Sequence, residues 1–404
     1  MRRPIISSRR LLPERGFRFM ATLRSSRVLL DHIADESPAA PVRVKEAKER
    51  GVPVVGTFCV FTPWELVRAV GGISVSLCST SEKPIAAAEA HLPRNLCPLI
   101  KASYGFALTD TCPYFHFCDI VIGETTCDGK KKMYEYLNRL RPVHVMQLPQ
   151  TTEGETARAL WRAETERLKS VLESFYGRTI TDDALREAIR LKNRERRVLN
   201  RFFAVARLDP SPLTGLEILA VSDYLKYSMA SEEALCVVEQ LTAALEEERR
   251  RGKGSETAGR KRILITGCPL GKSLHKVIRA VEEQGGGVVV AFENCGNLKS
   301  STDLVDESRP PMEAIADRYL NIPCSCMSPN PRRLEFLSRF REEYAVDGVV
   351  DVILQACHTY AVESFSVREH LKGLGIPYIA VETDYSQGDE GQLSTRLNAF
   401  LEML

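Results

Sequence analysis

The sequence predicts an α/β protein with two doubly wound parallel-sheet domains, of the Rossmann or flavodoxin-like type, and a helical segment between them. Three observations support this prediction. Short apolar runs alternate with helical patterns in the first part of the chain, the same alternation returns in the last part, and long amphipathic helices fill the stretch between. Strand, helix, strand alternation is typical of βαβ units. A length of 404 residues leaves room for two or three domains with cores of their own.

The chain divides into four expected parts. These are a basic leader and first helix (residues 1–45), an N-terminal α/β domain (46–150), a helical segment and linker (151–258) and a C-terminal α/β domain (259–404). The first 27 residues hold eight arginines and only one acid, Glu14. That composition resembles a transit leader, but we favour a ragged or over-long amino terminus with Met20 as an alternative start.

The first α/β part contains four expected strands. They cover residues 52–56, 73–77, 120–122 and 143–148, and helical patterns cover 27–50, 62–70 and 129–140. Their order along the chain favours a mostly parallel sheet.

The middle part contains long amphipathic helices. One spans 155–176 and ends at Gly177, a plausible C-cap. Thr181 is the expected N-cap of the next, with Asp182 and Asp183 in its first turn, where acids favour the positive helix end. Residues 246–255 are charged and then rich in glycine, so we expect a linker there.

The last part returns to alternation. Strands are expected at 262–266, 287–292, 348–354 and 377–381, with helices at 273–284, 332–344 and 361–374. The similar strand counts of the two halves suggest a remote duplication, although no residue-level repeat supports it.

Composition excludes several classes of protein. With 55 basic and 53 acidic residues the net charge is +2, so no overall field attracts nucleic acid or an anionic membrane. The sequence contains no run of 18 apolar residues, so no transmembrane helix is expected. The 12 cysteines stand out, but the chain is neither short nor led by an apolar secretory signal. We therefore expect a reducing cytoplasmic location instead of a disulfide framework.

Most cysteines follow expected strands. In open parallel sheets, ligands bind beyond the carboxyl ends of the strands. Six cysteines lie just past such ends and three more lie in loops beside prolines: Cys59, Cys78, Cys127, Cys268, Cys295 and Cys357, then Cys97, Cys324 and Cys326. Cys236, on an expected helix, has the character of a buried structural residue.

Three interpretations of this cluster are open: an iron–sulfur cluster, zinc, or no metal. Zinc sites usually contain paired CxxC or Cys-His elements. The chain has no CxxC, and its one close pair is Cys324-Ser-Cys326. Widely separated thiolates from two domains favour an iron–sulfur cluster, for which cysteine thiolate is the usual protein ligand.

Several segments resemble one known superfamily. GTFCVFTPWEL at 56–66, CPLIKASYG at 97–105 and TTCDGKK at 125–131 resemble motifs of the 2-hydroxyacyl-CoA dehydratase and benzoyl-CoA reductase superfamily. Five segments of the second half agree with this superfamily: VDGV (346–349), QACH (355–358), GIP (375–377), VETDY (381–385) and GQLSTRLNAF (391–400). The similarity extends from about residue 46 to the end of the chain.

The resemblance implies a ligand set. Ordinary subunits hold one [4Fe-4S] cubane with three cysteines, which match Cys97, Cys127 and Cys357 here. The additional cysteines make the chain look most like the double-cubane cluster proteins, whose [8Fe-9S] centre needs six ligands. Cys59, Cys295 and Cys326 complete the set by position, and Cys268 and Cys324 are the substitutes for these three.

The resemblance also implies a function. The expected protein is an anaerobic, cytoplasmic iron–sulfur oxidoreductase, a homodimer that receives low-potential electrons from a separate iron–sulfur ATPase, the activator, and reduces a small-molecule substrate. One alternative is a subunit of a radical 2-hydroxyacyl-CoA dehydratase, a lyase, which carries one [4Fe-4S] cluster, pairs with a different chain and binds coenzyme A. Another is a non-enzymatic electron carrier. Neither nucleic acid nor a membrane is an expected partner.

Catalytic candidates are few. His358, directly after Cys357, is the first candidate for a proton donor, although it could equally cap a helix start. Glu65 is a weaker candidate, as are Glu124 and Glu293.

Two further motifs are read as structural. Residues 267–273 resemble a phosphate loop with one residue too few between its glycines, and Pro269 removes a backbone donor, so we expect a strand-to-helix turn. Lys130 to Lys132 are expected on a solvated helix face, in preference to a docking surface for an acidic reductase.

Overall fold

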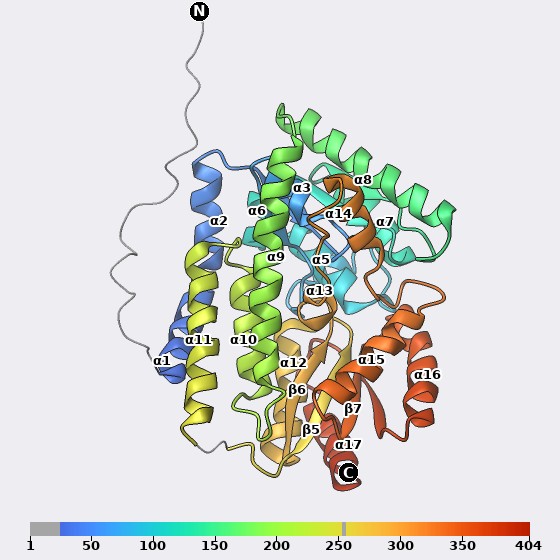
Figure 1. Cartoon of the computed structure of the whole chain (residues 1–404). Helices are drawn as coiled ribbons and strands as arrows, with labels where there is room; N and C mark the ends of the chain where they lie inside the picture. Colours follow the sequence, from blue (N-terminus) through green and yellow to red (C-terminus); the bar gives the residue numbers. More distant parts are fainter. Residues whose placement is uncertain (1–24, 253–255) are drawn as a thin grey trace, which may run out of the picture.

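The computed structural model describes residues 25–252 and 256–404. The interpretation of the basic leader therefore falls largely on residues 1–24, outside the described part. Two α/β domains, each built on a four-stranded parallel sheet, confirm the predicted fold class, and the helical segment lies beside them (Figure 1). No helix within the described ranges is long and apolar enough to cross a membrane.

The first sheet has the strand order β2-β1-β3-β4, and all its neighbours run parallel. Its strands are β1 (Val54–Thr57), β2 (Ile73–Ser76), β3 (Ile120–Glu124) and β4 (Val143–Met146). β3 is buried along its whole length, as its β-branched run predicts for an inner strand of a parallel sheet. The connecting helices are α3 (Trp64–Ala69), α4 (Ile85–Ala88), α5 (Pro98–Leu108), α6 (Pro113–Phe117) and α7 (Asp128–Leu137).

The second sheet repeats this arrangement in the order β6-β5-β7-β8. Its strands are β5 (Lys261–Gly267), β6 (Gly287–Glu293), β7 (Gly348–Leu354) and β8 (Tyr378–Thr383). The helices are α12 (Leu274–Arg279), α13 (Leu298–Ser301), α14 (Pro311–Leu320), α15 (Pro331–Glu343), α16 (His358–Gly373) and α17 (Glu390–Glu402). The helix expected at 273–284 is present but changes type, because a 3-10 turn, η2 (Gly271–Ser273), precedes α12 and a π-helical turn, η3 (Ala280–Gln284), continues it.

The remaining helices, from the start of the described chain and from the helical segment, flank both sheets. They are α1 (Ser26–Glu36), η1 (Ser37–Ala39), α2 (Ala40–Glu49), α8 (Glu155–Tyr176), α9 (Asp182–Val205), α10 (Gly215–Lys226) and α11 (Glu232–Arg250). The Thr181 side chain accepts from the Ala184 amide at the start of α9, and Gly177 ends α8 in the left-handed region, both as predicted. α9 contacts α3 in the first half and α13 and α14 in the second, and so joins them.

The expected linker begins later than the sequence suggests. α11 continues to Arg250, so residues 246–250 are helical. Glu247 pairs with both Arg250 and Arg251 across one helical turn, and such pairs stabilise an exposed helix end. The charged composition that suggested a linker is that of a solvated helix face.

Candidate functional site

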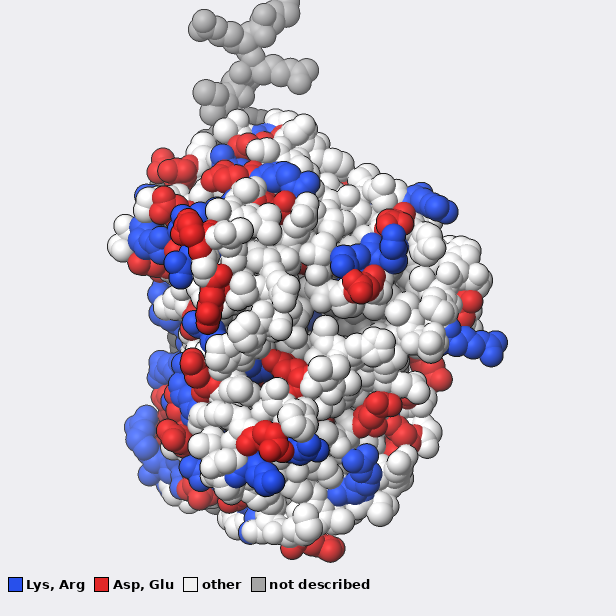
Figure 2. Space-filling view, turned by 90° about the vertical axis from the view of Figure 1, so that its right-hand side faces the viewer, with Lys and Arg blue, Asp and Glu red and all other residues white. Residues whose placement is uncertain are grey.

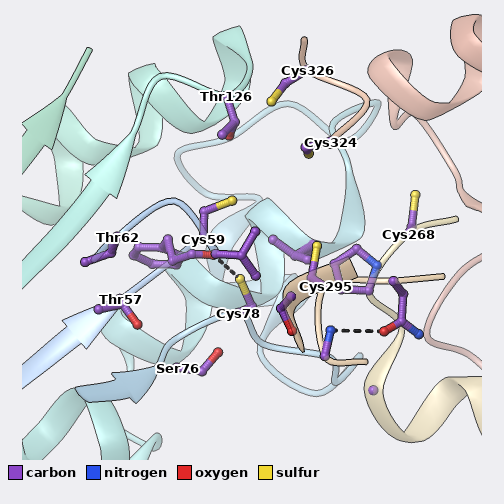
Figure 3. A pocket seen from close by; sticks show the side chains of 18 of the residues that line it. Thr57, Cys59, Thr62, Ser76, Cys78, Thr126, Cys268, Cys295, Cys324 and Cys326 are labelled. Atoms are coloured by element: carbon purple, nitrogen blue, oxygen red, sulfur yellow. Dashed lines mark hydrogen bonds between the residues drawn. The ribbon is translucent and has the colours of Figure 1, made fainter. Parts of the chain in front are cut away.

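The carboxyl ends of the two sheets meet at one cavity of about 650 Å³. Thr57 and Ser76 reach it from the first sheet, and Cys268, Asn294 and Leu354 from the second. Nine of the 12 cysteines line it: Cys59, Cys78, Cys97, Cys127, Cys268, Cys295, Cys324, Cys326 and Cys357. Figure 3 shows labelled cysteines from several elements pointing into this space. A parallel α/β sheet places ligands at this edge, so the position agrees with the sequence argument.

One group of thiols, here the Cys357 group, comprises Cys97, Cys127, Cys268 and Cys357. The thiols of Cys268 and Cys97 donate hydrogen bonds to the Cys357 sulfur, and these bonds lower the pKa of Cys357 to about 3. Cys127 lies close enough to interact electrostatically with Cys357. The first sheet's half supplies two members of this group and the second sheet's half the other two.

The second group, the Cys324 group, comprises Cys59, Cys78, Cys295, Cys324 and Cys326. Cys326 donates a hydrogen bond to the Cys324 sulfur and so lowers the pKa of Cys324 to about 6. Cys59 and Cys295 interact with Cys324 and with each other. Burial raises the pKa of both. Each group therefore has one sulfur that is most readily a thiolate.

The expected ligands divide evenly between the groups. Cys97, Cys127 and Cys357 fall in the Cys357 group, and Cys59, Cys295 and Cys326 in the Cys324 group. The substitutes Cys268 and Cys324 also line the cavity, one in each group. The expected ligand set left out Cys78, although the sequence placed it at the end of a strand like the others. Its thiol donates to the Phe58 carbonyl at 2.5 Å.

Three cysteines occupy helix starts. Cys97, Cys127 and Cys357 directly precede α5, α7 and α16 as their N-cap residues. Their sulfurs accept backbone amides of the first turn, for example that of Lys130 for Cys127 and that of Tyr360 for Cys357. Amides at a helix start stabilise a thiolate, which is the form that binds metal.

The other three cysteines lie elsewhere. Cys112, Cys118 and Cys236 do not line the cavity. Cys118 is buried and its thiol donates to the Phe115 carbonyl at 3.2 Å. Cys236 lies on α11 as expected, but it is half-buried and not the buried residue that the sequence suggested.

Glu65 is held in an ion pair that does not suit a proton donor. Its Oε1 lies 3.0 Å from Arg196 Nη1, and Tyr319 donates to its Oε2 at 2.7 Å. Burial alone would raise the pKa of Glu65, but Arg196 and Tyr319 outweigh it and lower that pKa. Glu65 therefore stays a carboxylate, and its geometry ties α3 to α9 and α14.

His358 starts α16 and lines the cavity while remaining exposed to solvent. It is thus the first residue of the helix and a neighbour of the Cys357 group, while the N-cap position is held by Cys357. The role of His358 as a proton donor stays a prediction.

Glu124 and Glu293 end β3 and β6, and both are fully buried. A threonine hydroxyl donates to each: Thr62 to Glu124 and Thr266 to Glu293. Burial raises the pKa of Glu124 to about 7, against the opposing effects of Thr62 and Lys130. The Oε2 atom of Glu124 has no hydrogen-bond partner in the described part of the chain.

Lys130 departs from the prediction of a solvated face. Its side chain lines the cavity, where Cys78, Tyr134, Cys59 and Cys127 surround it. Burial lowers the pKa of this ammonium group, but those four acidic groups outweigh burial and raise it. The prediction is correct for Lys132 and wrong for Lys130, because the start of α7 is directed at the cavity.

The loop at 267–273 is a turn, as predicted. Gly267 has φ of +120°, and a Cβ there would lie 2.1 Å from the Val352 carbonyl oxygen, so only glycine fits. The last three residues of the loop form the single helical turn η2, which leads into α12.

The donor set fits an iron–sulfur cluster better than a single ion. Within residues 25–252 and 256–404, no three His, Cys, Asp or Glu side chains converge on one metal ion. A cluster spans a larger volume and takes cysteine sulfurs from several directions. The cavity offers two such sets of sulfurs, with thiolate-stabilising amides in one of them.

Comparison with known proteins gives the same family. Residues 59–404 match the family of the 2-hydroxyglutaryl-CoA dehydratase D-component. The chain is 52% identical over 377 residues to YjiM of Escherichia coli, whose name assigns it provisionally to the dehydratase subunits, with 93% of this chain and 98% of that protein covered. It is 22% identical to the beta chain of (R)-phenyllactyl-CoA dehydratase of Clostridium sporogenes (89% and 94% covered) and 21% identical to one of the benzoyl-CoA reductase chains of Thauera aromatica (70% of each). The chain therefore belongs to the 2-hydroxyglutaryl-CoA dehydratase D-component family, within the superfamily of 2-hydroxyacyl-CoA dehydratase and benzoyl-CoA reductase subunits.

Proposed function

We propose that this protein is an iron–sulfur reductase that holds an [8Fe-9S] double cubane in the cavity and reduces a small substrate. The observation that carries the proposal is the division of the cavity's cysteines into two groups, each with at least three sulfurs. Cys97, Cys127 and Cys357 would hold one cubane, and Cys59, Cys295 and Cys326 the other. When bound, the centre would supply low-potential electrons.

The chain's own residues prepare this site. Helix-start amides stabilise thiolates in the Cys357 group, and the hydrogen bond from Cys326 does so for Cys324. Phe58, Trp64 and Tyr360 line the cavity and limit its contact with water. His358, half in the cavity and half in solvent, is suited to bring protons to a substrate at the Cys357 group.

Two partners belong to the proposal. The electrons would come from a separate ATP-dependent iron–sulfur activator in the cytoplasm, since the 267–273 turn lacks a phosphate loop. A second copy of the chain would complete a homodimer. In support of this, Val362 and Phe365 on α16 are 76% and 61% exposed. The face on the right of Figure 1, where α16 lies, also carries broad areas without charged residues (Figure 2).

Iron and sulfide quantification of anaerobically purified protein tests the proposal. We expect about eight irons per chain, since each cubane contains four. Single Ser substitutions at Cys59, Cys295 and Cys326 should each reduce iron toward about four and abolish reduction of small substrates. Cys236→Ser, a cysteine outside the cavity, is the matched control and should keep the full count.

The second candidate is a dehydratase subunit with one [4Fe-4S] cluster, and the names of the relatives favour it. It predicts about four irons per chain. In that case substitutions in the Cys324 group should leave both iron and spectrum unchanged, whereas Cys97→Ser, Cys127→Ser and Cys357→Ser should remove the cluster. That pattern would exclude the double-cubane proposal.

A further inference from the structure

Three successive lysines at the start of α7 have different environments. Lys132 is 75% exposed and pairs with Glu135 at 2.8 Å. Lys131 is 46% exposed at the cavity's rim and pairs with Asp128 at 2.6 Å. Lys130 is the inward member. It makes no ion pair with a carboxylate anywhere in residues 25–252 and 256–404, although Lys131 and Lys132 both do.

Lys130 lies near cysteines of both groups. It interacts with Cys127 of the Cys357 group and with Cys59 and Cys78 of the Cys324 group. Its own backbone amide also bonds the Cys127 sulfur. One ammonium group therefore faces sulfurs of both groups at once.

Lys130 is half-buried, and an ammonium group withdrawn from water without a counter-charge is unfavourable. The second half of the molecule avoids this cost internally. Lys299 lies 2.9 Å from Glu293 Oε1 and donates to the Tyr360 hydroxyl at 3.0 Å. Glu124 lies near Lys130 but forms no ion pair with it. The charge of Lys130 is thus left for an anion that occupies the cavity.

We propose that Lys130 is the counter-cation of the bound iron–sulfur centre and raises its reduction potential. A positive charge in a buried site stabilises each added electron, and nearby charge is one of the factors that set cluster potentials. This inference rests on the proposed function. Lys130 acts through the centre, so it is a positioning and tuning residue and not a catalytic one.

The test compares Lys130→Met with the wild-type protein, with Lys130→Arg and with Lys132→Met. Each is purified anaerobically, its iron is counted, and its midpoint potential is measured by redox titration with electron paramagnetic resonance. Lys130→Met should favour the oxidised form at least tenfold, a shift of 59 mV to more negative potential for a one-electron step. Lys130→Arg should restore most of the wild-type value, and Lys132→Met should not change it.

The outcomes separate this inference from the proposed function. Wild-type protein without iron would overturn the proposed function. Iron-loaded Lys130→Met with the wild-type potential would overturn the role of Lys130 alone, and an altered KM at that unchanged potential would assign Lys130 to the substrate instead. If Lys130→Met does not load iron, Lys130→Gln replaces it, with the same expected shift. Loss of iron from both neutral variants but not from Lys130→Arg supports a required charge, whereas loss from all three overturns it.

Discussion

The two sheets present the same edge to the cavity but differ in how they balance buried charge. Behind the second sheet's edge, the fully buried Arg333 lies 3.3 Å from Glu293, 4.0 Å from Asp351 and 2.5 Å from Glu363. Behind the first, Glu124 keeps an unbonded oxygen and Lys130 has no carboxylate partner within the described ranges. The second edge pairs its buried carboxylates with cations, although Asp351 Oδ1 has no hydrogen-bond partner in the described part of the chain. The first edge leaves its cation to an occupant of the cavity.

A shared local arrangement makes the difference informative. In each half a buried glutamate ends a strand, accepts a threonine hydroxyl and is followed six residues later by a lysine, the half-buried Lys130 or the buried Lys299. The strands are not equivalent, because β3 is an inner strand and β6 is an edge strand. Lys299 reaches its own glutamate and Lys130 does not. Similar local sequence thus gives a structural ion pair in one half and an available cation in the other.

The largest effect is expected from Arg333→Met. This change leaves Glu293, Asp351 and Glu363 without their shared cation, so unfolding in urea should show a loss of about 3–5 kcal/mol. Arg332→Met is the matched control. Arg332 pairs with Asp303 at 2.6 Å while 35% exposed, and such pairs contribute about 0–1 kcal/mol. Equal losses in the two variants would contradict the view that the second edge is held by its buried network.

The same comparison shows what could be predicted from the sequence. Parallel strands point their carboxyl ends the same way, so cysteines just past those ends were predictably neighbours. The position of cysteines past strand ends does not by itself assign them to two groups, because the grouping depends on how two domains face each other. The two expected sets of three, the first of them implied by the family resemblance, do fall in separate groups. The ion pair of Glu65 could not be predicted for a similar reason. Its partner Arg196 lies far along the chain on α9, and no local pattern indicates that contact.

The next effect concerns the two glutamates and depends on pH. The pKa of Glu124 is raised from its ordinary 4.5 to about 7, mainly by burial, so the folded state binds more protons than the unfolded state between these values. Stability from this group is therefore lost as pH rises from about 5 to 8, by about 3 kcal/mol. Glu124→Gln should be near wild-type stability at pH 5 and about 3 kcal/mol more stable than wild type at pH 8.

Glu293→Gln should behave in the opposite way. It removes the charge that Lys299 and Arg333 share, so it should destabilise the protein at both pH values, by about 3 kcal/mol. Urea unfolding of both variants at pH 5 and pH 8 measures how the free energy of unfolding of each one differs from that of the wild type. Parallel behaviour of the two variants would show that the two edges are electrostatically alike.

The smallest effect is expected from the two threonines. Thr62→Val removes one hydrogen bond, to a glutamate that is largely protonated below pH 7, so at pH 6 it should cost about 1 kcal/mol. Thr266→Val removes two, because Thr266 donates to Glu293 and also accepts from Arg333 Nη2 at 2.8 Å. Hydrogen bonds to charged groups contribute more, and a loss of about 2–3 kcal/mol is expected. Urea unfolding of both variants at pH 6 measures the difference. A larger loss for Thr62→Val would mean that Glu124 is ionised at this pH and that the first edge is closed by a cation, in which case Lys130 would not be available to an occupant of the cavity.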